Sequence, residues 1–89
     1  MSRIYFPTQK DLCDATIQAI KNLGGIAGTQ AINEEVVKIL HIPEEVVNLE
    51  DDSGLGTRLD YRLRWCKTEL KSKHKIMNIK RGTWAIENE

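Results

Sequence analysis

The sequence predicts a mainly helical domain that ends in a small β-hairpin. Apolar residues recur at helical spacing in three segments, capping residues, glycines or a proline separate these segments, and two short strand-like runs follow the last one. With 89 residues the chain has room for one hydrophobic core, so we expect a single domain over residues 1–89 with its core over about 7–87. The apolar fraction of 40% is typical of a folded globular chain.

The first helix is expected to begin at Thr8, whose hydroxyl can cap it while Asp11, three residues later, completes an approximate capping box. It is expected to end at Gly24 and Gly25, which suit a left-handed cap. Residues 26–28 then form a connector or one brief strand. The apolar stripe of this helix comprises Leu12, Cys13, Thr16, Ile17, Ile20 and Leu23.

A second helix is expected to be capped by Thr29 or, alternatively, by Asn33 with the two glutamates after it. Pro43 interrupts this helix because proline lacks the backbone N–H that the helical ladder needs. A short helical turn over residues 44–47 is expected next. The acidic, glycine-bearing stretch 49–56 is expected to be an exposed loop.

The third and longest helix is expected to run from about Thr57 to His74. Its buried seam consists of Leu59, Leu63, Cys66 and Leu70, which fall within a narrow arc of the helix. The opposite face is basic. We expect Tyr61 to be exposed, and we expect Trp65 and Trp84 to pack in the core because large aromatic side chains supply much of the apolar area of a small domain.

After this helix, residues 76–79 and 83–86 are rich in strand-forming side chains, and residues 80–82 form a turn with a basic tip. Three helices followed by a terminal hairpin are typical of a winged helix-turn-helix domain. Helix-turn-helix proteins place one helix in the major groove of DNA.

The zero formal net charge hides a strong asymmetry along the chain. Residues 1–55 hold four basic and nine acidic residues, a net charge of −5, whereas residues 56–89 hold nine basic and four acidic residues, a net charge of +5. Such asymmetry between halves indicates a polyanionic partner. The alternative is a solvated basic helix face that forms ion pairs with Glu44, Glu45 or the Glu50–Asp52 loop.

Basic residues of the third helix and the hairpin are therefore candidates for contact with duplex DNA. Those nearest the start of the helix, together with one tyrosine, are expected at the groove or its walls: Arg58, Tyr61, Arg62 and Arg64. Arg62 also lies near the buried seam, where it could be tied to the first helix. Phosphate contacts are expected from Lys67, Lys71, Lys73 and Lys75, and contacts from the wing tip are expected from Lys80 and Arg81.

No residue pattern indicates catalysis, a metal site or a cofactor. The metal-binding triad of many nucleases, two acids and a lysine, is imitated by Asp60, Glu69 and Lys71. On one helix, however, the two acids lie nine residues apart and point in opposite directions. Cys13 and Cys66 have neither the spacing of a zinc site nor that of a disulfide framework, so we expect reduced core thiols. Without an apolar span or signal peptide, the chain is expected to be cytoplasmic and independent of membranes.

Several segments of the chain resemble the N-terminal domain of Mrr-type restriction proteins, over about residues 7–87. The most specific parts are the basic and aromatic third helix and the R-G-x-W hairpin. The residues that carry the resemblance are Asn22, Leu23, Gly24, Gly25, Thr29, Gln30 and Ile32, then Arg58, Tyr61, Arg62, Leu63, Trp65, Cys66, Lys67 and Leu70, and finally Arg81, Gly82, Thr83, Trp84, Ala85 and Ile86.

The resemblance implies a winged-helix module that binds double-stranded DNA, plain or modified, and delivers a separate C-terminal nuclease domain to it. The nuclease half is not among these 89 residues, so no enzymatic activity is expected of them. Whether such a domain follows in a longer protein, and whether the module forms a homodimer, are left open. The alternative function is a winged helix that binds another protein.

Overall fold

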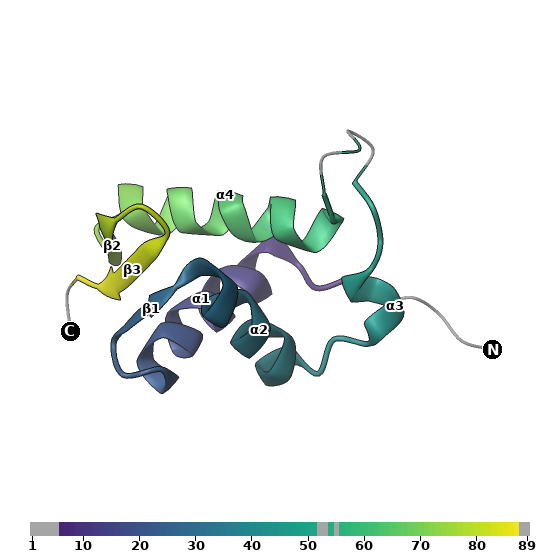
Figure 1. Ribbon diagram of the computed structural model, residues 1–89, viewed down its shortest axis with the longest axis horizontal. Coiled ribbons are helices and arrows are strands. Elements are labelled where there is room, and N and C mark those ends of the chain that lie inside the picture. Colours follow the sequence, from purple (N-terminus) through teal and green to yellow (C-terminus); the bar gives the residue numbers. More distant parts are fainter. Residues whose placement is uncertain (1–5, 52–53, 55, 88–89) are drawn as a thin grey trace.

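The computed structural model describes residues 6–51, 54 and 56–87 (Figure 1). Its elements are α1 (Gln9–Asn22), β1 (Ile26–Gly28), α2 (Thr29–Leu40), α3 (Glu44–Val47), α4 (Arg58–Ser72), β2 (Ile76–Lys80) and β3 (Thr83–Ile86). The strands form an antiparallel sheet in the order β1-β3-β2. This mainly helical chain with a C-terminal hairpin confirms the predicted fold class, the winged helix-turn-helix.

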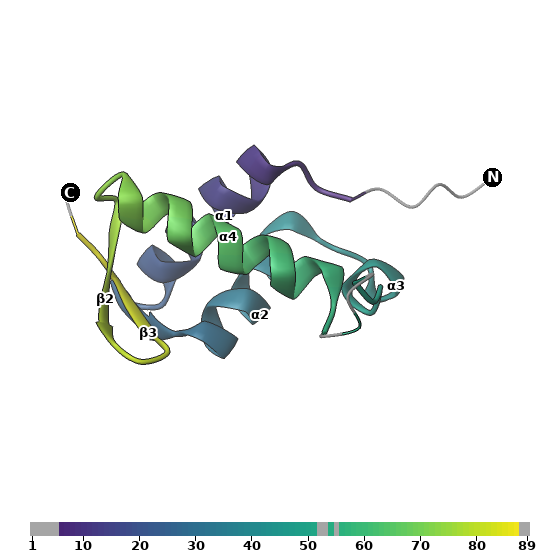
Figure 2. The same ribbon diagram turned by 90° about the horizontal axis from the view of Figure 1, so that it is seen from above.

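The core lies where α1 packs against both α2 and α4, while the sheet closes one end of the molecule. Seen from above, α4 crosses the other helices and the hairpin lies beside its C-terminal end (Figure 2). The largest fully buried side chains come from the four helices and β2: Leu12, Thr16, Ile20, Ile32, Val36, Val46, Leu63, Cys66 and Ile76.

The start and end of α1 agree with the sequence. The Thr8 side chain accepts a hydrogen bond from the backbone N–H of Asp11 at 3.1 Å. After the helix, Gly24 and Gly25 take φ values of 98° and 93°, a region that side chains with a Cβ rarely adopt. These two glycines turn the chain into β1, whose existence as a brief strand is thereby confirmed.

The expected cap of α2 is wrong. Gly28 occupies the N-cap position without a side-chain hydrogen bond, and the helix already begins at Thr29. Thr29 is held by β3 and the hairpin turn, because its backbone N–H donates to the Gly82 carbonyl at 2.9 Å and its hydroxyl accepts from Trp84 Nε1 at 3.2 Å. The Thr29 hydroxyl therefore takes part in a tertiary hydrogen bond instead of the helix cap that the sequence predicted.

Helix α4 begins as predicted, with the Thr57 side chain accepting from the backbone N–H of Asp60 at 3.1 Å. It ends at Ser72, two residues before the predicted end, because His74 takes a left-handed conformation with φ 61°. Lys75 N–H then donates to the Leu70 carbonyl at 2.9 Å, which closes the helix and directs the chain into β2.

The loop before α4 is anchored at its base. Glu50 and Thr57 form an isolated antiparallel bridge, and the backbone N–H of Arg58 donates to the Leu49 carbonyl at 2.8 Å. The predicted loop also includes residues 52, 53 and 55, which lie outside the described residues.

The hairpin matches its prediction, with β2 extended by one residue to Lys80. Its register shifts between Asn78 and Lys80. The Asn78 side-chain amide donates to the carbonyls of Lys80 and Thr83, at 2.8 and 2.9 Å, and so ties the two strands together next to the turn. The tip carrying Lys80 and Arg81 is thus supported from within the hairpin.

Candidate nucleic-acid interface

Helix α4 places one face in the core and leaves the other in water. Leu59, Leu63, Cys66 and Leu70 are buried, as the spacing predicted. Because these four residues occupy a narrow arc, the residues on the opposite side of α4 point into solvent. Figure 1 shows this side of α4 running along the upper edge of the molecule, away from α1 and α2.

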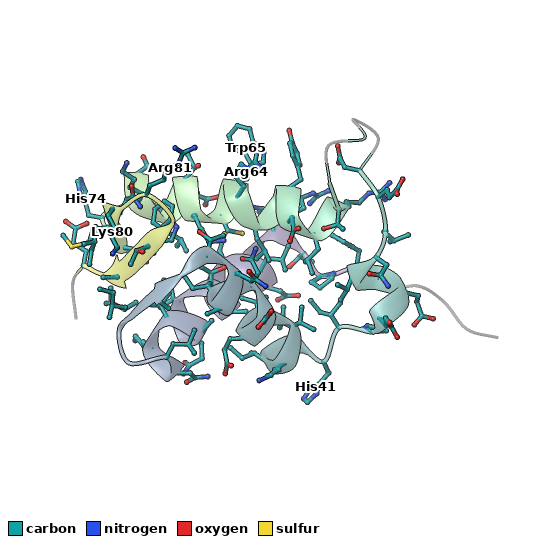
Figure 3. All side chains as sticks on the ribbon, viewed as in Figure 1. His41, Arg64, Trp65, His74, Lys80 and Arg81 are labelled. Carbon is teal, nitrogen blue, oxygen red and sulfur yellow. The ribbon has the colours of Figure 1, made fainter. Side chains whose placement is uncertain are left out.

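Seven of the predicted cations on α4, the segment after it and the hairpin are exposed, and five of them form neither an ion pair nor a cation–π contact among the described residues: Arg64, Lys71, Lys75, Lys80 and Arg81. Within the described ranges, none of these five forms an ion pair with a carboxylate. Figure 3 shows Arg64 on α4 and Lys80 and Arg81 on the neighbouring hairpin. We call these five residues the cationic strip.

The remaining predicted cations have other surroundings. The Arg62 guanidinium lies over the Phe6 ring, 5.6 Å from its centroid, on the flank of α4 that faces α1. Lys73 donates to Glu69 at 2.9 Å in an exposed pair one turn apart. Arg58 is half-buried at the start of the helix. Arg62 could be tied to the first helix according to its sequence position, but its guanidinium contacts Phe6, which precedes α1, and only its backbone carbonyl accepts from α1, from Gln9 Nε2 at 3.4 Å.

Lys67, from which a phosphate contact is expected, is not exposed on the surface of α4. The residue is only 3% exposed, because α2 and β3 cover this flank of the helix. Its Nζ donates to Asn33 Oδ1 of α2 at 2.8 Å. Burial lowers the pKa of the Lys67 ammonium from 10.5 to about 8, and the nearby positive charge of Arg64 contributes to the decrease.

The burial of the aromatic side chains differs from the prediction. Trp65 is 52% exposed, so the expectation that it packs in the core is wrong. It forms an edge-to-face pair with Tyr61, which is exposed as predicted, with ring centroids 6.3 Å apart. Trp84 is partly buried and packs against the core. Tyr61 and Trp65 lie one turn apart on α4, so an exposed aromatic pair lies beside Arg64 (Figure 3).

A cavity of about 300 Å³ lies on the flank of α4 that faces α2 and β3. Sequence reasoning missed this cavity. Lys67 and Trp84 contribute its buried and half-buried walls, and the exposed residues Arg64 and Thr68 lie at its rim. The residues come from three separate elements, and no spacing along the chain indicates that they meet.

The two acids of the apparent nuclease triad lie on opposite flanks of α4, as their spacing predicted. Asp60 accepts from Asn33 Nδ2 of α2 at 3.5 Å, whereas Glu69 pairs with Lys73 on the side that faces α1. Among the described residues, no three His, Cys, Asp or Glu side chains gather where a metal ion could be held. The helices in the same part of the chain also lack the length and apolar character needed to cross a membrane.

The two cysteines meet in the core between α1 and α4. Their sulfur atoms lie 3.0 Å apart, both residues are buried, and both thiols are free. Burial is the main cause that raises the pKa of the Cys66 thiol, and the neighbouring Cys13 adds to it. This placement confirms the prediction of reduced core thiols.

Comparison with known protein families identifies residues 10–89 as an Mrr N-terminal domain. The chain belongs to the Mrr N-terminal domain family. No match was found among curated proteins or among solved structures. Membership associates this Mrr N-terminal domain with Mrr restriction proteins, in agreement with the resemblance noted from its third helix and hairpin. The match covers nearly the whole chain, and it includes the cationic strip and the cavity beside it.

Proposed function

We propose that this Mrr N-terminal domain binds double-stranded DNA through α4 and the hairpin. The observation that carries the proposal is the cationic strip, which continues from α4 onto the hairpin without ion pairs among the described residues. Unpaired lysines and arginines gain most from DNA, because each phosphate that they neutralise releases condensed counterions. No carboxylate of α2 or α3 forms an ion pair with a residue of the cationic strip.

In this proposal α4 enters the major groove and the hairpin lies along the backbone. An α-helix fits the major groove, and arginine can donate two hydrogen bonds to a guanine base there. Arg64 contacts the DNA backbone at the wall of the groove, and Lys71 and Lys75 follow the backbone further along the helix. Tyr61 and Trp65 add apolar contact surface beside Arg64, where thymine methyl groups line the groove.

Fluorescence anisotropy with a labelled duplex at low salt tests the proposal. The double variant Arg64→Glu, Lys71→Glu should lose about tenfold or more in affinity because two phosphate or base contacts become repulsive. The matched control is Lys21→Glu, Lys38→Glu, which changes the net charge equally at the C-terminal ends of α1 and α2. Equal losses in both variants would contradict α4 as the binding face, and no binding by the wild type would refute the function itself.

A second candidate function, association with another protein chain, is favoured by apolar residues on the sheet. Ile26 and Met77 both pair with Ala85, so all three lie on the same face of the sheet, and the first two are 49% and 42% exposed. If this face forms a homodimer, light scattering will give twice the monomer mass, and Met77→Lys will restore the monomer. A monomeric wild type would exclude self-association through this face.

A further inference from the structure

The cavity beside α4 contains a buried positive charge whose placement the packing of the domain does not require. Lys67 is 3% exposed, and its ammonium donates a hydrogen bond to the neutral amide of Asn33. Taking an ammonium group out of water is costly unless a carboxylate or an anion compensates it. An apolar side chain of similar length would fill this position without that cost, so the cation indicates a ligand rather than a structural role.

The surroundings of Lys67 favour an anion. Arg64 and Asp60 of α4 both line the same cavity, so two positive charges and one negative charge face it. Asp60 is already in contact with Asn33 Nδ2, which turns Asn33 Oδ1 toward Lys67. The other titratable neighbour on α4 is the buried Cys66 thiol, while α2 and β3 contribute the neutral side chains of Asn33 and Trp84.

The backbone adds to this positive potential. Thr29, the first residue of α2, lines the cavity, so the positive end of a 12-residue helix dipole lies at its edge. Gly28 offers no side chain to cap that helix end. The N-terminal ends of helices are favourable positions for phosphate groups.

We propose that the cavity receives one phosphate of the bound DNA backbone, which Lys67 and Arg64 hold between them while Asn33 positions the lysine. The inference rests on the proposed DNA binding and adds a buried phosphate site to its exposed contacts. Because α4 forms one wall of the cavity, a phosphate held here would fix how deeply the helix enters the groove.

A consequence is that binding takes up a proton. The Lys67 ammonium has a pKa of about 8 in the free protein, and a phosphate beside it would raise that pKa. As the pH rises from 7 to 9, the free site loses its proton while the occupied site keeps it. By linkage, the affinity for DNA should fall about tenfold over this range.

The test compares duplex affinity at pH 7, 8 and 9, at constant ionic strength, for the wild type, Lys67→Gln and Lys71→Gln. The wild type and Lys71→Gln should both show the tenfold fall, although Lys71→Gln starts weaker. Lys67→Gln should bind weakly at pH 7 and change less than about twofold with pH. The proposal is overturned if Lys67→Gln binds like the wild type or keeps the same pH dependence.

A second measurement does not depend on a variant that folds. The NMR signal of the Lys67 ε-carbon reports the pKa of its ammonium directly, with duplex DNA or inorganic phosphate as titrant. A rise of at least about one unit with the duplex alone supports a backbone phosphate, because one unit corresponds to tenfold linkage. An unchanged pKa with bound duplex, or an equal rise with inorganic phosphate, overturns the site as a DNA contact. A wild type that binds no duplex at all refutes the proposed function instead.

Discussion

At the scale of single residues, Lys67 shows how a tertiary contact can change the chemistry of a side chain. Lys71, one turn further along α4, is exposed and belongs to the cationic strip, whereas Lys67 is covered by α2 and β3. Lys67 lies at the edge of the buried seam, whereas Lys71 lies on the solvent side of the helix. The difference in burial makes Lys67 a weaker base and, at neutral pH, an unfavourable contributor to folding.

Replacing Lys67 with methionine should therefore stabilise the fold at pH 7 by about 1 to 3 kcal/mol, since a decrease of the pKa from 10.5 to about 8 corresponds to about 3 kcal/mol. Where the pH lies between these two pKa values, the unfolded chain binds more protons at this residue than the folded chain does. The free energy of unfolding of the wild type should therefore rise with pH. From this group the gain is about 1 kcal/mol between pH 7 and 9. Urea unfolding at both pH values measures it, and a variant less stable than the wild type at pH 7 would contradict the assignment.

The two thiols lead to a second prediction at this scale. Since Cys13 and Cys66 are buried and the pKa of Cys66 is raised, neither thiol should react rapidly with a disulfide reagent such as dithionitrobenzoate. Two thiols per chain should react once guanidinium chloride unfolds the protein. Rapid reaction of one thiol in the native state would mean that the contact between α1 and α4 opens readily.

At the scale of elements, helix starts are governed by short-range chemistry. Thr8 and Thr57 cap α1 and α4 with hydrogen bonds three residues along, which the sequence predicted in both cases. For α2 the same reasoning failed, because the Thr29 hydroxyl is used by Trp84. A capping residue in the sequence thus predicts the start of a helix reliably where no other element binds its side chain.

Removing the cap of α4 should destabilise the whole domain. Thr57→Ala leaves the backbone N–H of Asp60 without its acceptor and should cost about 1 kcal/mol. Thr68→Ala in the middle of the same helix is the matched control, because its hydroxyl only donates back to the Arg64 carbonyl. That change should be neutral or slightly stabilising. Thermal unfolding followed by circular dichroism compares the two, and an equal effect of both would argue against the cap.

At the scale of the whole molecule, folding converts the charge asymmetry along the chain into a charge asymmetry between faces of the domain. The basic C-terminal part forms α4 and the hairpin, whereas acidic residues lie on α2 and α3. A domain with zero formal charge therefore presents a cationic face. Long-range attraction of a polyanion depends on this local distribution rather than on the net charge.

If the five residues of the cationic strip each neutralise one phosphate, the logarithm of the DNA affinity should fall with the logarithm of salt concentration with a slope of about −4 to −5. Anisotropy titrations between low and physiological salt give this slope. The Arg64→Glu, Lys71→Glu variant should show a slope lower in magnitude by about 2, provided that binding remains measurable. A slope near zero for the wild type would contradict an interface made of phosphate contacts.

The sequence by itself determined the helices, the hairpin, two of the helix caps and the buried seam of α4, because these depend on contacts between residues close in the chain. It also separated Asp60 from Glu69, since helix geometry alone sets their directions. Only the tertiary structure decided that Trp65 is exposed and that Lys67 is buried in a cavity. Residues at the edge of a helical stripe become buried or exposed according to how far neighbouring elements extend over them, and helical periodicity contains no information about those neighbours.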